Sequence, residues 1–302
     1  MDRFRELSTF LAVAEEGAFN AAARRLRMSP PAVTRLVTAL ETRLGVRLFA
    51  RSTRRVTLTE AGRRLREDAA RILGDLEEAE TSATGVQATP SGELNVTAPV
   101  LFGRRFLAPI LRDYLDAFPS VTARVLLLDR NVSLTEEGLD AALRIGELAD
   151  SSLAALRVGA VRHVTVAAPD YLRRHGRPEN PAELTAARVV FITGVADVPA
   201  WTYVRDGRRQ TIRLAPALQV NSTEAAVEAA LAGWGIARPL SYQVADALAD
   251  GGLVEILEDF EDRLIPIHLL HAEGRRPSAK LRSFIDFAAG RLRGEAARML
   301  AR

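Results

Sequence analysis

The stretch from residue 19 to residue 62 constrains the fold more than any other part of this chain. It reads FNAAARRLRMSPPAVTRLVTALETRLGVRLFARSTRRVTLTEAG. Two short helical patterns flank a polar break, and a glycine, a basic β-ribbon and a new helix start follow. This order is typical of a winged helix-turn-helix, a fold in which the second helix of the pair enters the major groove of DNA.

The second helix of this pair is expected to run from Pro30 to Leu44. Ser29 can cap its N-terminus, Pro30 suits the first helical position, and Gly45 suits the left-handed conformation that follows a helix. One face is apolar and carries Val33, Val37, Leu40 and Leu44. The opposite face carries Pro31, Thr34, Arg35, Thr38 and Thr42. Short side chains and one arginine allow close approach to base edges, although an ordinary surface helix has the same amphipathic pattern.

The neighbouring segments complete the predicted domain, residues 1–60. One helix is expected from Phe4 to Glu16, and a second from Asn20 to Leu26 with Asn20 as its cap. Two short strands are expected around Ser52-Thr53, and their turn carries arginines. In a wing these arginines lie along the phosphate backbone, whereas in an ordinary loop they are simply solvated.

Residues 1–65 resemble the DNA-binding domain of LysR-type transcriptional regulators. The motifs that carry the resemblance are FNAAARRL (19–26), SPPAVTR (29–35), LETRLGVRLF (40–49) and TLTEAG (57–62). The family often has Gln where this chain has Pro30, so base reading is expected to depend on Thr34, Arg35 and the residues around Pro31. The predicted DNA-binding residues are Asn20, Ser29, Pro30, Pro31, Ala32, Thr34, Arg35, Thr38, Arg51, Ser52, Thr53, Arg54 and Arg55.

The charge of the chain agrees with this assignment. The net charge is only +3, but 13 arginines and 6 acidic residues give residues 1–65 a charge of +7. Residues 66–80 carry −4, and the remaining 26 basic and 26 acidic residues cancel. The positive field therefore lies at the predicted DNA-binding end.

Residues 59–88 are expected to form a linker helix and hinge. Apolar residues recur three or four positions apart at Leu58, Ala61, Leu65, Ala69, Ile72, Leu76, Ala79, Ala83 and Val86. This spacing predicts a coiled-coil seam, with Leu65, Ile72 and Leu76 as its dimerisation residues, and in the resembled family this helix dimerises. The alternative is an amphipathic helix packed on its own domain. The segment from Thr84 to Gly92 breaks the helix and is the expected hinge.

Residues 89–302 alternate strand and helix patterns, which predicts an α/β domain with a parallel or mixed sheet and helices on both faces. Two crossings of the chain predict two lobes, about 92–162 with 265–302 and about 163–264. Strands are expected at 93–98, 122–128, 141–145, 161–168, 189–193, 218–220 and 265–271, with a hairpin at Asp206-Gly207. Helices are expected at 105–118, 132–137, 223–232 and 280–292.

This region resembles the LysR-type effector domain and the periplasmic-binding-protein fold. The matching segments are LNVTAPVLF (94–102), EGLDAALRIG (137–146), DSSL (150–153) and ALAGWGIA (230–237). Ligands of open α/β sheets bind beyond the carboxyl ends of the strands, which predicts an effector in the cleft between the lobes. The predicted effector-binding residues are Thr97, Pro99, Val100, Leu101, Phe102, Arg144, Ile145, Thr193, Asn221, Ser222 and Ile236.

Structural roles remain open for several of these residues. Asn221 and Ser222 can simply cap a helix, and Arg144 can form a structural ion pair. The segment VLFG (100–103) and Trp201 point to an apolar or aromatic effector, although Trp201 fits a hydrophobic core equally well.

Other chemistry finds little support in the sequence. The chain has no cysteine, which excludes disulfides and Cys-based zinc sites, and it lacks the motifs G-x-S-x-G and G-x-x-x-x-G-K-[ST]. His268 and His271 are expected on one strand, where their spacing points them to opposite faces. We therefore expect no enzyme activity, no cofactor and no metal site. With no signal-peptide core or membrane-length apolar run, the expected compartment is the cytoplasm.

The favoured hypothesis is a regulator that binds inverted-repeat promoter sites in double-stranded DNA and responds to a small-molecule co-inducer. The family resemblance implies a homodimer that assembles into a homotetramer, without a membrane partner. One alternative is an architectural DNA-binding protein without an effector. Another is an enzyme or solute-binding protein that uses the two-lobed domain alone.

Overall fold

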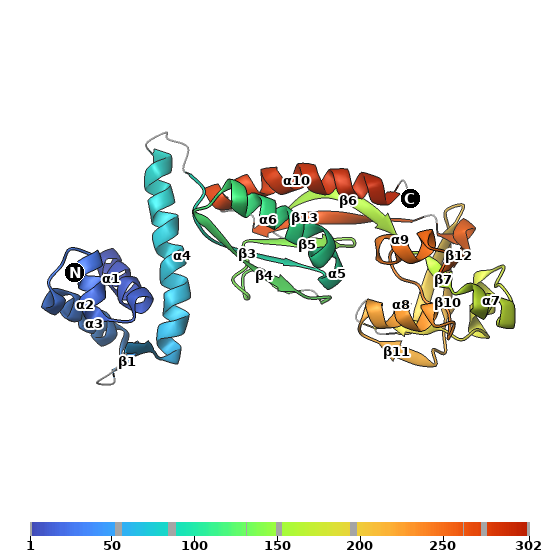
Figure 1. Ribbon diagram of the computed structural model, residues 1–302, viewed down its shortest axis with the longest axis horizontal. Coiled ribbons are helices and arrows are strands. Elements are labelled where there is room, and N and C mark those ends of the chain that lie inside the picture. The colour runs from blue at the N-terminus through green and yellow to red at the C-terminus, as the bar shows by residue number, and fades with distance from the viewer. Residues whose placement is uncertain are drawn as a thin grey trace. The chain divides into compact units, whose positions relative to one another are not determined.

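The computed structural model divides the chain into two compact units, Met1–Thr89 and Pro90–Arg302 (Figure 1). Each unit has hydrophobic cores of its own. The residues that the structure describes are 2–51, 56–83, 89–130, 132–148, 153–193, 198–261, 263–272 and 277–300.

The N-terminal unit is a winged helix-turn-helix followed by a long helix, as the sequence predicts. Strands β1 and β2 pair antiparallel, with Ala50 opposite Thr57. The three short helices enclose a core that includes Phe10, Val33 and Leu40, all fully buried. In chain order the elements are α1 (Arg3–Glu16), α2 (Phe19–Arg25), α3 (Pro30–Leu44), β1 (Phe49–Arg51), β2 (Val56–Leu58) and α4 (Glu60–Ala83).

Two details at the helix ends differ from the sequence prediction. Asn20 does not cap α2, because the helix begins one residue earlier and Ala22 donates its amide to the carbonyl of Ala18. Leu44 was predicted on the apolar face of α3, but it is 40% exposed because this last residue of the helix extends beyond the core. Gly45 follows it with φ of 69°, the left-handed conformation expected after a helix.

The backbone N–H and C=O of Leu48 join three elements of this unit. Its N–H donates to the carboxylate of Glu41 at 2.8 Å, which ties α3 to β1. Its carbonyl accepts from the amide of Thr59 at 2.9 Å, just before α4. The hydroxyl of Thr59 accepts in turn from the amide of Gly62 at 3.0 Å and so caps α4. The TLTEAG motif is thereby explained as the junction between the wing and the long helix.

The first lobe of the C-terminal unit is built on a five-stranded mixed sheet of order β4-β3-β5-β13-β6. Strands β3, β4 and β5 are parallel, and β13 runs antiparallel to both β5 and β6. The strands are β3 (Gly92–Ala98), β4 (Val121–Leu127), β5 (Ala141–Ile145), β6 (Leu153–Arg162) and β13 (Leu264–Ala272). The helices are α5 (Val100–Phe102), a π-helical stretch (Gly103–Leu107), α6 (Ala108–Ala117) and α10 (Ala279–Leu300).

Helices α6 and α10 cover the same face of this sheet, so the expectation of helices on both faces does not hold for the first lobe. Residues of α6 and α10 belong to one core, which also contains Leu269 of β13. The next residue, Leu270, points to the opposite face and packs in a small cluster with Leu134 and Ala142. The helix predicted from Val132 to Glu137 is wrong: among the described residues of this segment the chain forms turns.

Among its described residues the second lobe contains three two-stranded sheets, of order β11-β8, β12-β7 and β10-β9. The segment around Ile236 and Ala237 bridges β7 and β8, because Ile236 pairs with Val189 and Ala237 with Val166. The expected strand at 161–168 is two strands, the end of β6 and β7. The strands are β7 (Thr165–Ala167), β8 (Val190–Ile192), β9 (Ala200–Arg205), β10 (Arg208–Arg213), β11 (Leu218–Val220) and β12 (Val254–Ile256). The helices are α7 (Pro169–His175), α8 (Thr223–Leu231), α9 (Ser241–Ala249) and the 3-10 turns Pro181–Thr185 and Glu258–Phe260.

Helix α9, which the sequence did not predict, belongs to both lobes. Tyr242 packs in the core of the first lobe, with its ring 5.5 Å from that of Phe102, whereas Val244 packs in the second lobe. Arg105 donates to the carbonyl of Tyr242 at 3.0 Å and pairs with Asp246. The lobes are therefore joined by this helix as well as by the two chain crossings.

Substitution of Gly62 tests the junction at Leu48. A Cβ at Gly62 would lie 2.1 Å from the carbonyl oxygen of Leu48, so Gly62→Ala must push α4 away from β1. We expect a loss of about 1–3 kcal/mol in the stability of the N-terminal unit. Gly74→Ala is the matched control, because nothing lies within 4 Å of its added Cβ, and it should stabilise α4 by about 0.5–1 kcal/mol. Amide hydrogen exchange of peptides from this unit measures both; equal protection in the two variants would contradict the role of Leu48.

Candidate nucleic-acid interface and ligand cavity

Helix α3 presents a face of short side chains to solvent. Arg35 and Thr38 are exposed, while Val33, Val37 and Leu40 on the opposite face are fully buried. This exposed face forms a surface hollow lined by Pro30, Pro31, Thr34, Arg35, Thr38, Ala39, Thr42 and Arg43. Small residues around one long cationic side chain are the arrangement that lets a helix approach base edges closely.

The N-terminus of α3 keeps a free hydroxyl. Ser29 occupies the cap position, but its side chain makes no capping hydrogen bond. The reason lies in the following residues: Pro31 has no N–H, and the amide of Ala32 donates to the carbonyl of Ser29 at 2.9 Å. Thr34 donates its hydroxyl to the carbonyl of Pro30 at 3.0 Å, which leaves its oxygen as an acceptor.

The arginines of this unit separate into paired and unpaired groups. Arg43 binds the buried carboxylate of Glu6 through Nε at 3.1 Å and Nη2 at 2.7 Å, and Arg25 pairs with Glu15 at 2.5 Å. Arg35 is exposed, and within the described ranges no hydrogen-bond or ionic partner is found for it. Of the other predicted residues, Asn20 is exposed, Arg51 ends β1, and Ser52, Thr53, Arg54 and Arg55 lie outside the described residues.

The predicted dimer seam of α4 divides into two parts. Ala69 is fully buried in the core of its own unit, and the partly buried Leu65 packs against that core, so pairing of Leu65 with a second helix stays a prediction. This part follows the alternative interpretation, a helix packed on its own domain. Farther along, Ile72 is 39% exposed. The seam stays a prediction for Ile72 and Leu76.

A cavity of about 230 Å³ lies where the chain crosses between the lobes of the C-terminal unit. Glu147 follows β5 and Ile265 lies in β13, whereas Thr202 and Val204 come from β9 of the second lobe. The complete lining is Glu147, His163, Thr202, Val204, Arg238, Phe260, Glu261, Arg263 and Ile265.

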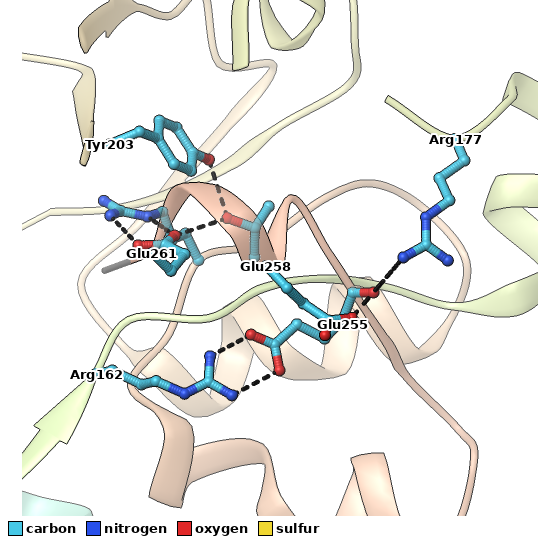
Figure 2. A network of polar contacts seen from close by, with 8 residues as sticks. Arg162, Arg177, Tyr203, Glu255, Glu258 and Glu261 are labelled. Carbon is cyan, nitrogen blue, oxygen red and sulfur yellow. Dashed lines mark hydrogen bonds and ion pairs between the residues drawn. The ribbon is translucent and has the colours of Figure 1, made fainter. Parts of the chain in front are cut away.

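A buried ion pair forms one wall of this cavity. Arg238 binds Glu261 through Nε at 2.6 Å and Nη2 at 2.7 Å, and the two side chains are only 8% and 5% exposed. The hydroxyl of Thr165 donates to Glu261 at 3.1 Å and lies 2.9 Å from the hydroxyl of Tyr203 (Figure 2). Burial raises the pKa of Tyr203, so the phenol stays protonated and donates to Thr165. The guanidinium of Arg238 also lies 4.5 Å from the Tyr203 ring centre.

A second ion pair ties the lobes beside the crossing. Arg162, at the end of β6, donates hydrogen bonds to both carboxylate oxygens of Glu255 in β12, and the bond from Nη2 to Oε2 is 2.8 Å long (Figure 2). Arg177 donates to the backbone carbonyl of Glu255 at 2.9 Å. The planar guanidinium suits this two-point contact, which fixes the position of β12 against the first lobe.

The predicted effector-binding residues do not line this cavity. Phe102 and Ile236 are 1% and 0% exposed and belong to the hydrophobic cores of the first and second lobe, so their role in ligand binding stays a prediction. Trp201 is likewise a core residue, 7% exposed. Periodicity alone does not distinguish a core side chain from one that lines a cavity.

The other predicted residues mostly serve local structure. Ser222 caps α8 by accepting from the amide of Ala225 at 3.2 Å, and Thr193 donates to the carbonyl of Val220 at 3.2 Å. Arg144 donates to the carbonyl of Val132 rather than to an acidic partner. Asn221 is exposed. The remaining predicted residues are partly or largely buried, namely Thr97, Pro99, Val100, Leu101 and Ile145. A ligand-binding role for these residues stays a prediction.

None of the residues that line the cavity is among the predicted effector-binding residues. The sequence does contain a signal for the cavity, because His163 and Ile265 flank the two predicted crossings between the lobes.

Two buried acids of the N-terminal unit were also not predicted. Glu6 lies four residues before Phe10, and Glu41 four after Val37, so each lies on the apolar stripe of its helix, where a carboxylate needs a partner.

No group of three or more His, Cys, Asp and Glu side chains within the described ranges can hold a metal ion. The described helices also include none with the length and apolarity that crossing a bilayer requires.

His163 gives the second lobe a pH-dependent stability. Burial, with a smaller effect of the nearby Arg238 charge, lowers its pKa from 6.5 to about 4. The imidazole therefore favours its neutral form in the folded state. The stability that this provides is present above pH 6.5 and is lost as the pH falls towards 4.

Replacing His163 should flatten this pH dependence. In the parent protein, the buried imidazole lowers the free energy of unfolding by about 2 kcal/mol as the pH falls from 7 to 5. This decrease should be absent in His163→Gln, because Gln does not titrate. Both tryptophans of the chain, Trp201 and Trp234, lie in the second lobe, so urea unfolding followed by tryptophan fluorescence measures that lobe. Parallel stability curves for the parent protein and the variant would contradict the effect.

Comparison with known proteins identifies both units. Residues 4–63 match the family profile described as bacterial regulatory helix-turn-helix protein, lysR family, and residues 87–293 match LysR substrate binding domain. The HTH-type transcriptional regulator CrgA of Neisseria meningitidis is 32% identical over 283 residues, covering 93% of this chain and 94% of that protein. An HTH-type transcriptional regulator of Xanthomonas campestris is 33% identical over 296 residues, covering 97% of this chain and 86% of that protein.

Solved structures agree over nearly the full length. CrgA of Neisseria meningitidis matches with a TM-score of 0.60 and 31% identity, covering 95% of this chain and 98% of the other. The virulence activator AphB of Vibrio cholerae matches with a TM-score of 0.60 and 27% identity, covering 96% and 99%. The chain therefore belongs to the LysR family of DNA-binding transcriptional regulators, with an N-terminal helix-turn-helix domain and a C-terminal effector-binding domain.

Proposed function

We propose that α3 is the recognition helix and that Arg35 reads base edges in the major groove. The observation that carries this proposal is the exposed face of α3, on which the unpaired Arg35 stands among Pro31, Thr38 and other short side chains. The free hydroxyl of Ser29, at the positive end of the helix, is placed to bind a phosphate. The predicted wing arginines, from Arg51 to Arg55, would hold the flanking backbone.

Two copies of this domain would read an inverted repeat. The exposed apolar residue Ile72, followed one turn later by Leu76, supports pairing of α4 with the same helix of a second chain. The pairing face is short, because the earlier part of the seam is already buried within its own unit. We extend this proposal to a homotetramer formed by further contacts between the C-terminal domains, acting on promoter DNA in the cytoplasm.

The effector is proposed to bind in the cavity between the lobes. Its lining comes from both lobes and from both chain crossings, so a bound molecule contacts each side. Such a ligand can change the balance between two lobe arrangements by its differential affinity for them. We therefore expect the effector to alter how the oligomer contacts its promoter.

Arg35→Ala tests the proposed recognition helix. The change should weaken binding to a cognate duplex by about 1–3 kcal/mol and reduce the preference over a scrambled duplex. Arg25→Ala removes the same charge from a side chain already paired with Glu15, and it should leave the sequence preference unchanged. Binding isotherms on both duplexes at several salt concentrations give the two quantities. Equal losses on cognate and scrambled DNA would make Arg35 a phosphate contact only.

The double change Ile72→Glu and Leu76→Glu tests the dimer seam. Two carboxylates facing their symmetry copies would repel each other without a partner charge, so the mass measured by light scattering should fall by half. Ala70→Glu introduces a carboxylate at an exposed position off the seam and should keep the parent mass. If the double variant also keeps the parent mass, α4 is not the dimer interface.

A further inference from the structure

We infer that the cavity between the lobes takes a small organic monoanion, a carboxylate on a short apolar body. This inference names the ligand class of the proposed effector site and rests on that proposal. Four observations carry it: the state of the buried ion pair, the exposed ion pair at the mouth, the charge of the β9–β10 hairpin and the size of the space.

The buried ion pair offers no free charge to a ligand. Glu261 receives two hydrogen bonds from Arg238 and one from Thr165. The remaining donor capacity of Arg238 goes to the carbonyl of Thr202 at 2.9 Å and to the face of Tyr203. Opening this pair would leave a buried charge without a partner, which is strongly unfavourable. The Arg238–Glu261 pair therefore presents no net charge to the cavity, and the neighbouring His163 favours its neutral form.

The second ion pair of the cavity is exchangeable. Arg263 binds Glu147 at 3.1 Å, but the two side chains are 48% and 67% exposed. A pair so open to water contributes little to stability. A ligand carboxylate can therefore replace Glu147 on the guanidinium of Arg263 while Glu147 returns to solvent. The guanidinium can hold the incoming carboxylate in a two-point contact.

The adjacent hairpin favours an anion over a cation. Residues 200–213 contain four arginines and one aspartate, a charge of +3, whereas the rest of residues 81–302 carries a charge of −3. In the strand register Arg209 lies opposite Val204 and Arg213 opposite Ala200. Opposite residues of an antiparallel pair share a face, so both arginines lie on the face of Thr202 and Val204, which line the cavity.

These two arginines have no partner within the described ranges, whereas both acids that line the cavity are paired. A cationic ligand would have to displace an arginine and would face the repulsion of Arg209 and Arg213. An anion gains their attraction in addition to the contact with Arg263.

The space and its apolar wall limit the body of the ligand. At about 230 Å³ the cavity lies below the roughly 300–1,000 Å³ that drug-sized ligands occupy. Val204, Phe260 and Ile265 supply the apolar lining, and Arg205 stacks 4.9 Å from the Phe260 ring centre, which holds that ring in place. A short branched or single-ring carboxylate fits both limits.

Matched acid and amide probes test this inference on the full-length protein. The probes are benzoate with benzamide, cyclohexanecarboxylate with its amide, and 3-methylbutanoate with its amide. Each pair differs in charge but scarcely in size. Titration calorimetry should show binding of at least one acid, binding of its amide at least about tenfold weaker, and a loss of acid affinity as salt is raised.

Three variants locate the binding. Arg263→Gln should weaken the acid about tenfold and leave the amide unchanged, since only the charge contact is lost. Arg209→Gln should weaken the acid by a few-fold through lost attraction. Arg208→Gln is the matched control, because Arg208 lies opposite Arg205 on the other face of the hairpin, and it should bind as the parent does.

The inference is overturned if no acid binds up to about 10 mM, if an amide binds as tightly as its acid, or if Arg263→Gln leaves acid affinity intact. Promoter footprinting with the same acids separates this inference from the proposed function. An acid that binds in the Arg263-dependent manner without changing the footprint leaves the ligand class standing and removes the effector role of the cavity. A footprint that changes equally in Arg263→Gln places the effector elsewhere and overturns both.

Discussion

The DNA-binding unit depends on the backbone of Leu48, whose N–H and C=O are both hydrogen-bonded. Its N–H is bound by the buried carboxylate of Glu41, and its carbonyl is bound by the amide of Thr59. Glu41 also accepts from the amide of Phe49 at 3.2 Å, so a charge that would be costly to bury alone is well satisfied. The direction of α3, the start of the wing and the start of α4 are thereby set relative to one another. A helix and a wing that contact one DNA duplex together need this fixed relation, since both must fit the same groove and backbone.

The second lobe uses a similar device for a different purpose. Glu261, Arg238 and Thr165 come from three distant parts of the chain, and their hydrogen bonds hold these segments together beside the chain crossing. In both units a buried carboxylate binds several donors from separate segments. Around Glu41 the donors are mainly backbone amides, whereas around Glu261 they are side chains.

The sequence predicted most of the fold but few of the lining residues, for reasons that particular residues show. Caps and periodicity are local, so the glycine after α3 and the Asp206-Gly207 hairpin, with φ of 51° and 72°, were predictable. The turns at 132–137 were mistaken for a helix because short apolar spacing does not distinguish a helix from a turn packed on a sheet. Phe102 was assigned to a cleft because it follows a strand, but Tyr242, 140 residues later in the sequence, covers it. Such contacts depend on which distant segments meet, and no local pattern contains that information.

The same limit applies to the arginines, which supply every basic side chain except Lys280. Their number indicates a nucleic-acid partner only for residues 1–65, and their separate roles follow from what surrounds each one. Arg238 is neutralised within a wall, Arg162 joins two strands, Arg263 holds an acid loosely at the surface, and Arg35 stands without a partner among the described residues. Burial fixes Arg238 in a single geometry, because breaking a buried pair leaves an uncompensated charge. Arg162 is partly exposed and is held by its two-point contact with Glu255. Arg263 and Arg35 are exposed, so each can exchange bound water or a weakly held acid for an anion. The available positive charge of this protein is therefore found at exposed arginines, on the face of α3 and at the mouth of the cavity, and these are the places where a phosphate or a carboxylate can bind at little cost to the fold.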